Sequence, residues 1–287
     1  MPSGRKLAGM STRAVLVLPF AALAVVAAMA GGVLLFRSST SERASVAVAT
    51  VEPESSAPDP VYKPGASVCQ GVLHRPSVKA DRTFPAIYTK RIQTNGLTIV
   101  GDARVDDAAM EAARKTVERL FLNNNLEDRL AEEGAYIIVA DSKQGVLDLP
   151  EFACLSGQTS IDFDHVCGVA DRADYPVATV NELDLLGDRS GPCGGLNILF
   201  HEIGHLIQGW TLGPADYFDV KQFYQESINN GTYKRGVDYA TTNPNEYFAE
   251  STQAYFLSMD LRGLRDRAWL KLHDPDMYAL LANVYGD

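Results

Sequence analysis

Apolar residues near the N-terminus form one long uncharged run. Ala14–Phe36 is twenty-three residues long, with three basic residues before it and Arg37 after it. As a helix it would measure about 34 Å, enough to cross a hydrocarbon core of roughly 30 Å. Because the basic residues precede the run, we predict that residues 1–13 form a cytoplasmic tail and that the chain after the run is exported. A cleaved signal peptide, cut after Ala30, is the alternative, and it also gives an extracytoplasmic protein.

The apolar pattern stops after this run. Residues 37–66 are rich in Ser, Ala, Val and Pro and keep neither a helical nor a strand period, which indicates a flexible linker. We therefore expect one folded domain over residues 67–287.

Periodic apolar positions in the folded part predict strands first and helices later. The expected strands are Leu97–Val100, Ala135–Ala140 and Val177–Val180. The expected helices are one from Asp106 to about Asn123, then Leu196–Trp210, one within Asp216–Ile228, Pro244–Ser258 and Pro275–Tyr285. Asn243 and Asp274 each precede a proline, a combination typical of a helix start. The order predicts an α+β fold with a small sheet and a helical C-terminal half.

Composition and charge exclude several classes of protein. With 46% hydrophobic residues and a net charge of -10, the chain is neither collagen-like nor wholly disordered, and it lacks the basic excess of a nucleic-acid binder. The acidic residues lie almost entirely in the expected folded domain. We hypothesise that this acidity favours basic substrates.

The four cysteines agree with export. Cys69, Cys154, Cys167 and Cys193 have no CxxC spacing, so two disulfides are more plausible than a thiolate metal site. Three pairings are possible, and we favour Cys154 with Cys167 and Cys69 with Cys193. Asn230 begins an Asn-Gly-Thr glycosylation acceptor, which matters only if the host glycosylates exported proteins.

The sequence His201-Glu202-Ile203-Gly204-His205 carries the clearest chemical signal. Two histidines four residues apart on a helix share one face and can bind one ion, and Glu202 lies beside them, where it can take a proton from a water. HExxH is the zinc metallopeptidase pattern. Two histidines with ordinary hydrogen bonds are the plain structural alternative. Gly204 in a helix interior suggests a second backbone packed closely against it.

The third metal ligand must come from elsewhere in the chain. Positions 208 and 211 are Gln208 and Thr211, so the HExxHxxGxxH pattern fails. Glu246 and Glu250 lie one turn apart in the helix after Asn243, and a glutamate there would complete a gluzincin shell while the other holds a ligand histidine. A solvated acidic face or a capping box is the alternative.

These motifs together resemble the catalytic domain of anthrax lethal factor and the related secreted Pro-Pro endopeptidases. Both families have HExGH, then a tyrosine seven residues before a glutamate, then a second glutamate one turn later; here these are Tyr239, Glu246 and Glu250. The resemblance implies a zincin-like metallopeptidase domain with one Zn²⁺ ion on His201, His205 and Glu246. It further implies Glu202 as general base, Tyr239 as oxyanion stabiliser and Glu250 as the outer partner of the site. The predicted membrane segment departs from the soluble members.

The sequence therefore predicts a zinc-dependent endopeptidase acting on proteins or peptides, with a membrane contact through its N-terminal segment and no nucleic-acid partner. Three alternatives stay open. Tyr239 could be a packed surface aromatic, the chain could be a catalytically silent binding module on the same fold, or the enzyme could be an aminopeptidase, although no motif that captures a free amine is evident.

Overall fold

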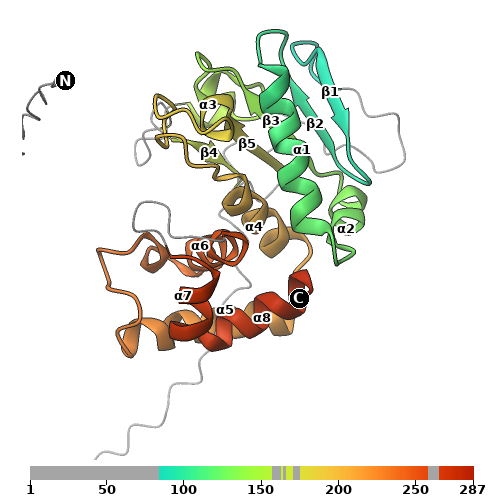
Figure 1. Ribbon diagram of the computed structural model, residues 1–287. Coiled ribbons are helices and arrows are strands. Elements are labelled where there is room, and N and C mark those ends of the chain that lie inside the picture. Colours follow the sequence, from blue (N-terminus) through green and yellow to red (C-terminus); the bar gives the residue numbers. More distant parts are fainter. Residues whose placement is uncertain (1–83, 157–162, 164–165, 171–174, 258–264) are drawn as a thin grey trace, which may run out of the picture. The chain divides into compact units, whose positions relative to one another are not determined.

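The computed structural model describes residues 84–156, 163, 166–170, 175–257 and 265–287 (Figure 1). The predicted tail, apolar run and linker lie outside these residues, so they stay predictions. Among the residues described, no helix is both long and apolar enough to cross a membrane.

One five-stranded sheet runs through the described part of the chain, in the order β1-β2-β3-β5-β4. The strands are β1 (Lys90–Gln93), β2 (Thr98–Gly101), β3 (Tyr136–Ala140), β4 (Gly168–Val169) and β5 (Val177–Asn181). β2, β3 and β5 are parallel, whereas β1 and β4 pair antiparallel at the two edges. The three strands predicted from sequence are thus confirmed within one residue at each end, and they form the centre of the sheet.

The sheet is buried on both faces because its strands alternate between two apolar clusters. Ile137 and Val139 of β3 belong to the larger cluster, which includes residues of the helices. Tyr136 and Ile138 belong to a second cluster, together with Val146, Leu149 and Phe152. Every residue of β3 and β5 is buried. Alternate side chains of a strand point to opposite faces, so two covered faces give continuously apolar strands.

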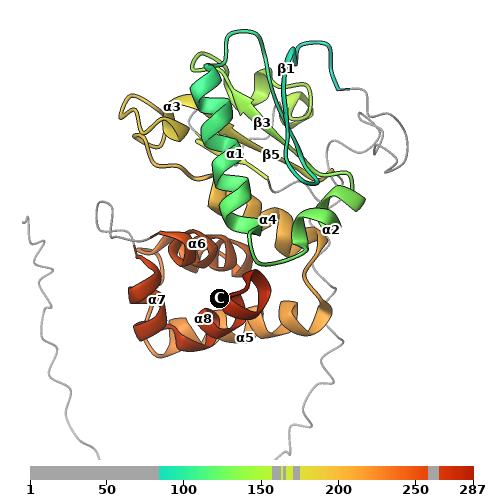
Figure 2. The ribbon, with the colours of Figure 1, turned by 45° about the vertical axis from the view of Figure 1, so that its right-hand side comes forward.

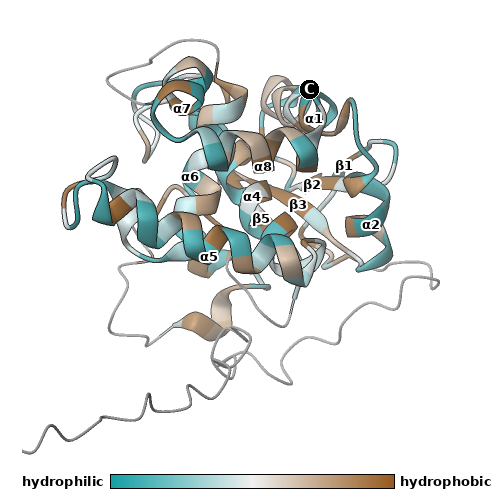
Figure 3. Cartoon of the chain, turned by 90° about the horizontal axis from the view of Figure 1, so that it is seen from below, coloured by the Kyte–Doolittle hydropathy of each residue, from teal (hydrophilic) through white to brown (hydrophobic). Residues whose placement is uncertain are grey.

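Eight helices accompany the sheet among the described residues. They are α1 (Asp107–Phe121), α2 (Leu126–Glu132), α3 (Glu182–Leu185), α4 (Leu199–Trp210), α5 (Pro214–Asn229), α6 (Pro244–Phe256), α7 (Arg267–His273) and α8 (Pro275–Tyr285). In Figures 1 and 2, α1 crosses one face of the sheet, and α5 to α8 gather on the side of α4 away from it. Figure 3 shows that α5 carries mainly hydrophilic residues. Only three residues of this helix are buried, Val220, Tyr224 and Ser227. The predicted α+β order is therefore confirmed.

The helix ends follow their capping residues. Asp106 caps α1 by accepting a hydrogen bond from the Ala108 N–H, and Asn243 caps α6 by accepting from two backbone N–H groups. The helix predicted from Leu196 begins three residues later, at Leu199, because the Asn197 side chain accepts from the Leu199 N–H and turns the chain there. Asp274 precedes α8 as expected, but its carboxylate accepts a hydrogen bond from the Tyr247 hydroxyl instead of capping the helix.

Both favoured disulfide pairings are wrong. Cys167 bonds to Cys193, and Cys154 is disulfide-bonded as well. The sequence does not predict this pairing because the two cysteines are twenty-six residues apart. They meet because β4 pairs antiparallel with β5 at the sheet edge, which brings Cys167 next to the loop before α4. The bond thus joins the edge strand to the segment before α4.

Candidate metal centre

The two histidines of the HExxH sequence lie on one face of α4. Nε2 of His201 and Nε2 of His205 are 3.1 Å apart, and both imidazoles are more than nine-tenths buried. α4 is held between the sheet and α6, with Ile203, Leu206 and Ile207 fully buried in the larger cluster. The apolar side of this helix therefore fixes the orientation of its polar side.

Glu246 of α6 faces both imidazoles. Its Oε2 lies 3.1 Å from His201 Nε2 and 3.5 Å from His205 Nε2. Ligands about 2.05 Å from one tetrahedral metal ion are separated from one another by roughly 3.3 Å. The three atoms thus lie at the corners that a tetrahedral ion would require, and His201, His205 and Glu246 could hold a metal ion.

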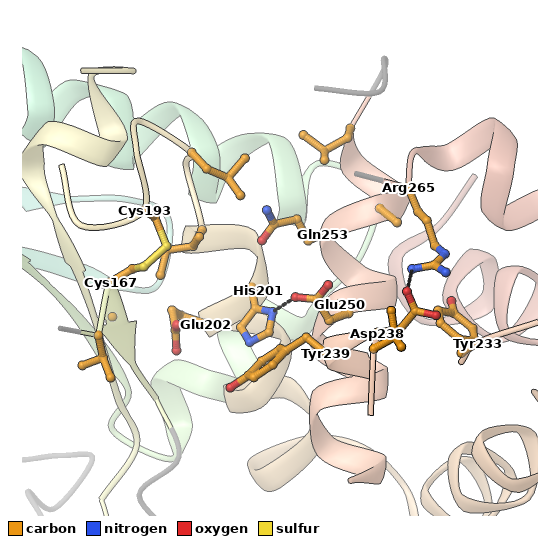
Figure 4. A pocket seen from close by; sticks show the side chains of 17 residues that line it. Cys167, Cys193, His201, Glu202, Tyr233, Asp238, Tyr239, Glu250, Gln253 and Arg265 are labelled. Atoms are coloured by element: carbon orange, nitrogen blue, oxygen red, sulfur yellow. Dashed lines mark ion pairs between the residues drawn. A yellow bond between two sulfur atoms is a disulfide. The ribbon is translucent and has the colours of Figure 1, made fainter. Parts of the chain in front are cut away.

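Glu250 holds His201 from its other side. One turn beyond Glu246, its Oε1 lies 3.1 Å from His201 Nδ1 (Figure 4). A carboxylate on Nδ1 keeps the proton on that nitrogen and leaves Nε2 free to bind a metal. The acidic pair therefore does not form a solvated face, which was the alternative for Glu246 and Glu250.

The electrostatics of the site favour a cation. Burial acts to lower the pKa of His201, but its contacts with Glu246 and Glu250 outweigh burial and raise that pKa above the ordinary value. The same imidazoles lower the pKa of Glu246 despite its burial. The carboxylates thus stabilise positive charge where the three candidate ligands meet.

Gly204 lets α4 and α6 approach closely enough to form the site. A Cβ at this position would lie 3.1 Å from Ala249 Cα and 3.2 Å from Thr252 Cβ. The close backbone packing predicted from this glycine is confirmed.

Glu202 and Tyr239 line the pocket beside the histidines. Glu202 is 5% exposed, and a Cβ added at Gly168 of β4 would lie 3.2 Å from its Cγ. Tyr239 begins the 3-10 turn η4 (Tyr239–Thr241), and its ring centroid is 6.3 Å from that of His201. Figure 4 shows its hydroxyl directed to the side of the pocket where Glu202 lies. Tyr239 is 59% exposed, so most of its surface is open to solvent.

The pocket has a cavity volume of about 480 Å³ and includes residues that the sequence reasoning missed. They come from β4, the loop before α4, the later turns of α6 and the segment before α7; among them are Cys167, Cys193, Gln253 and Arg265. Gln253 could have been found, since it lies seven residues after Glu246 and so shares its helix face. The disulfide partners could not, because they depend on the path of β4.

A second group of candidate ligands has a different explanation. Cys167, Cys193 and Asp184 also lie close together. The two sulfur atoms are bonded to each other, and the Asp184 carboxylate accepts hydrogen bonds from the Cys193 and Gly195 N–H groups. This cluster therefore stabilises the loop that precedes α4.

One known protein family matches most of the described residues. The family model described as "Anthrax toxin lethal factor, N- and C-terminal domain" matches residues 88–284, which include the whole site and most of the described fold. A search of curated proteins finds no match to the chain.

Proposed function

This chain belongs to the anthrax toxin lethal factor family, and we propose that it is an extracytoplasmic zinc-dependent endopeptidase of the gluzincin type. The observation that carries the proposal is the convergence of His201 Nε2, His205 Nε2 and Glu246 Oε2 at 3.1–3.5 Å, next to a pocket that His201 and Glu202 line. Two imidazoles and one carboxylate form the ligand set of catalytic zinc sites that keep a position open for water.

The residues of the pocket divide the reaction among them. Zinc, when bound, would polarise the scissile carbonyl and lower the pKa of a water. Glu202 takes the proton of the attacking water and returns it to the nitrogen of the leaving amine. The Tyr239 hydroxyl donates a hydrogen bond to the oxyanion that develops on the carbonyl. Glu250 keeps the His201 ring in orientation.

The location of the enzyme is part of the proposal. The uncharged run Ala14–Phe36 follows basic residues, and the Cys167–Cys193 disulfide needs an oxidising compartment. Both features support a catalytic domain outside the cytoplasm, either anchored or released after cleavage at Ala30. Its substrates would be proteins or peptides that extend along the pocket.

Glu202→Gln tests the assignment. The amide keeps the shape of the side chain but takes no proton, so we expect zinc to stay bound and turnover to fall by roughly 100-fold to 10,000-fold. Cleavage of a random peptide library, read by mass spectrometry, measures turnover, and elemental analysis measures zinc. Undiminished cleavage by the zinc-loaded variant would contradict Glu202 as the base.

A further inference from the structure

The wall of the pocket contains a buried amide side chain, Gln253, that the mechanism does not use. Gln253 lies on α6 seven residues after Glu246, so it projects from the same helix face. Figure 4 shows it between Glu250 and the Cys167–Cys193 disulfide. The lining of the same pocket includes four apolar side chains, Leu196, Ile198, Ala254 and Leu257.

The amide oxygen of Gln253 is buried without a hydrogen-bond partner. The residue is 6% exposed, and within the part of the chain that the structure describes its Oε1 accepts no hydrogen bond. A buried acceptor without a partner destabilises the folded protein, and almost all such groups in native proteins are satisfied. A ligand in the pocket that brings a donor would remove this cost.

The charges around the pocket favour a neutral donor. Asp238 is paired with Arg265 at 3.0 Å, and Glu250 is in contact with His201. A lysine side chain of the substrate that reached Gln253 would therefore meet an uncharged acceptor. The nearby carboxylates of Asp238 and Glu250 already contact other side chains. Burial of an ammonium group without a counter-ion is costly.

We propose that Gln253 is a specificity-determining residue that accepts a hydrogen bond from a neutral donor side chain of the bound peptide, namely Asn, Gln, Ser or Thr. The inference rests on the proposed peptidase function. A site with a buried acceptor discriminates against isosteres that lack the donor, because the acceptor then stays unpaired in the complex.

Matched peptide pairs test this role. In a cleaved peptide, each position that flanks the scissile bond is varied as Asn against Leu and as Thr against Val. At one position we expect the donor peptide to have a kcat/KM higher by roughly 10-fold or more. Gln253→Met should remove this ratio. Gln253→Glu, which keeps the acceptor and adds charge, should shift the preference toward Lys.

Gln208→Met is the matched control. Gln208 of α4 is also buried, and its Nε2 has no partner among the residues described, but it does not line the pocket. The same substitution there should leave the peptide ratio unchanged. An equal loss of the ratio in both variants would mean a general effect on the fold and would overturn the proposal.

Equilibrium binding of the same peptide pairs to zinc-loaded Glu202→Gln separates the two proposals. The role of Gln253 is overturned if the kcat/KM ratio between the paired peptides is unchanged in Gln253→Met, or if no position shows a donor preference. Either result leaves the proposed peptidase function in place, because the peptides are still cleaved. If a backbone N–H of the peptide satisfied Gln253, no position would show a donor preference, and this result would also overturn the proposed role. If Glu202→Gln binds the donor peptide more tightly and the wild type cleaves neither peptide, the role of Gln253 is supported and the peptidase function is refuted. If no peptide binds, both proposals are refuted.

Discussion

Glu246 and Glu250 contact the same imidazole from opposite sides. Glu246 lies against Nε2 of His201 and Glu250 against Nδ1, although the two glutamates are only one helical turn apart on α6. The imidazole is therefore held in its orientation from both sides. Tyr239, by contrast, is mostly exposed, although it also lines the pocket.

Tyr239→Phe isolates the contribution of one hydroxyl. The phenyl ring keeps the contact with His201, but it has no hydrogen to donate to the oxyanion, so we expect kcat to fall by about 100-fold with zinc content unchanged. Steady-state kinetics on a cleaved peptide measure the effect. Phe218→Leu, a change at an exposed aromatic on α5 outside the pocket, is the control. An unchanged kcat in Tyr239→Phe would remove this residue from the mechanism.

The contact between α4 and α6 depends on the small side chain at position 204. Gly204→Val would force its Cβ against Ala249 Cα, and backbone atoms cannot move aside as a flexible side chain can. We expect the free energy of unfolding to fall by about 1–3 kcal/mol, as in other overpacked cores, and zinc affinity to fall with it. Urea denaturation measures the first and metal titration the second.

Gly209→Ala is the matched control in the same helix. A Cβ there would meet no atom of the described residues within 4 Å, so alanine should raise the free energy of unfolding by up to about 1 kcal/mol through helix propensity. If Gly204→Val were as stable as the wild type, the close packing of the two helices would not limit stability.

The disulfide connects the edge strand β4 to the loop before α4. Cys167→Ala with Cys193→Ala opens a loop of twenty-six residues, which in the chain-entropy account lowers the free energy of unfolding by about 3.5 kcal/mol. Because both cysteines line the pocket, KM for a cleaved peptide should rise as well. Thermal unfolding and steady-state kinetics check the two effects, and an unchanged melting temperature would contradict the first.

Local signals in the sequence predicted most elements, and the failures have physical causes. Asp106 and Asn243 marked helix starts correctly because a cap acts within three residues. β4 escaped prediction because two residues carry no period, and α7 because it is only seven residues long and buries Leu270 alone. The cysteine pairing depends on the antiparallel return of β4, which no local pattern encodes.

The candidate site was more predictable than the loops around it. Its residues lie on two helices at spacings of four and seven, and the 3.6-residue period converts such spacings into a shared face. His201, His205 and Glu246 therefore lie close together, and Glu250 contacts His201, as these spacings predict. Gln253 obeys the same period, but nothing in the sequence distinguishes an unpaired buried amide from a paired one.

At the scale of the whole molecule, the candidate metal ligands join two differently supported parts of the fold. α4 packs against β5 of the sheet, whereas α6 packs against α5, α7 and α8. His201 and His205 come from α4 and Glu246 from α6. An ion that binds all three stabilises the native state and not the unfolded chain, so its removal should weaken the domain as a unit.

Chelation tests this coupling. At a free zinc concentration of 1,000 times Kd, binding contributes about 4 kcal/mol to the free energy of unfolding, which corresponds to roughly 10 °C in melting temperature for a domain of this size. A chelator should therefore lower the melting temperature by about that amount, and added zinc should restore it. Glu246→Ala should show a smaller zinc-dependent shift, because one ligand is missing. Equal shifts in the variant and the wild type would mean that zinc stabilises the protein from another site, and full zinc occupancy in the variant would exclude Glu246 as the third ligand.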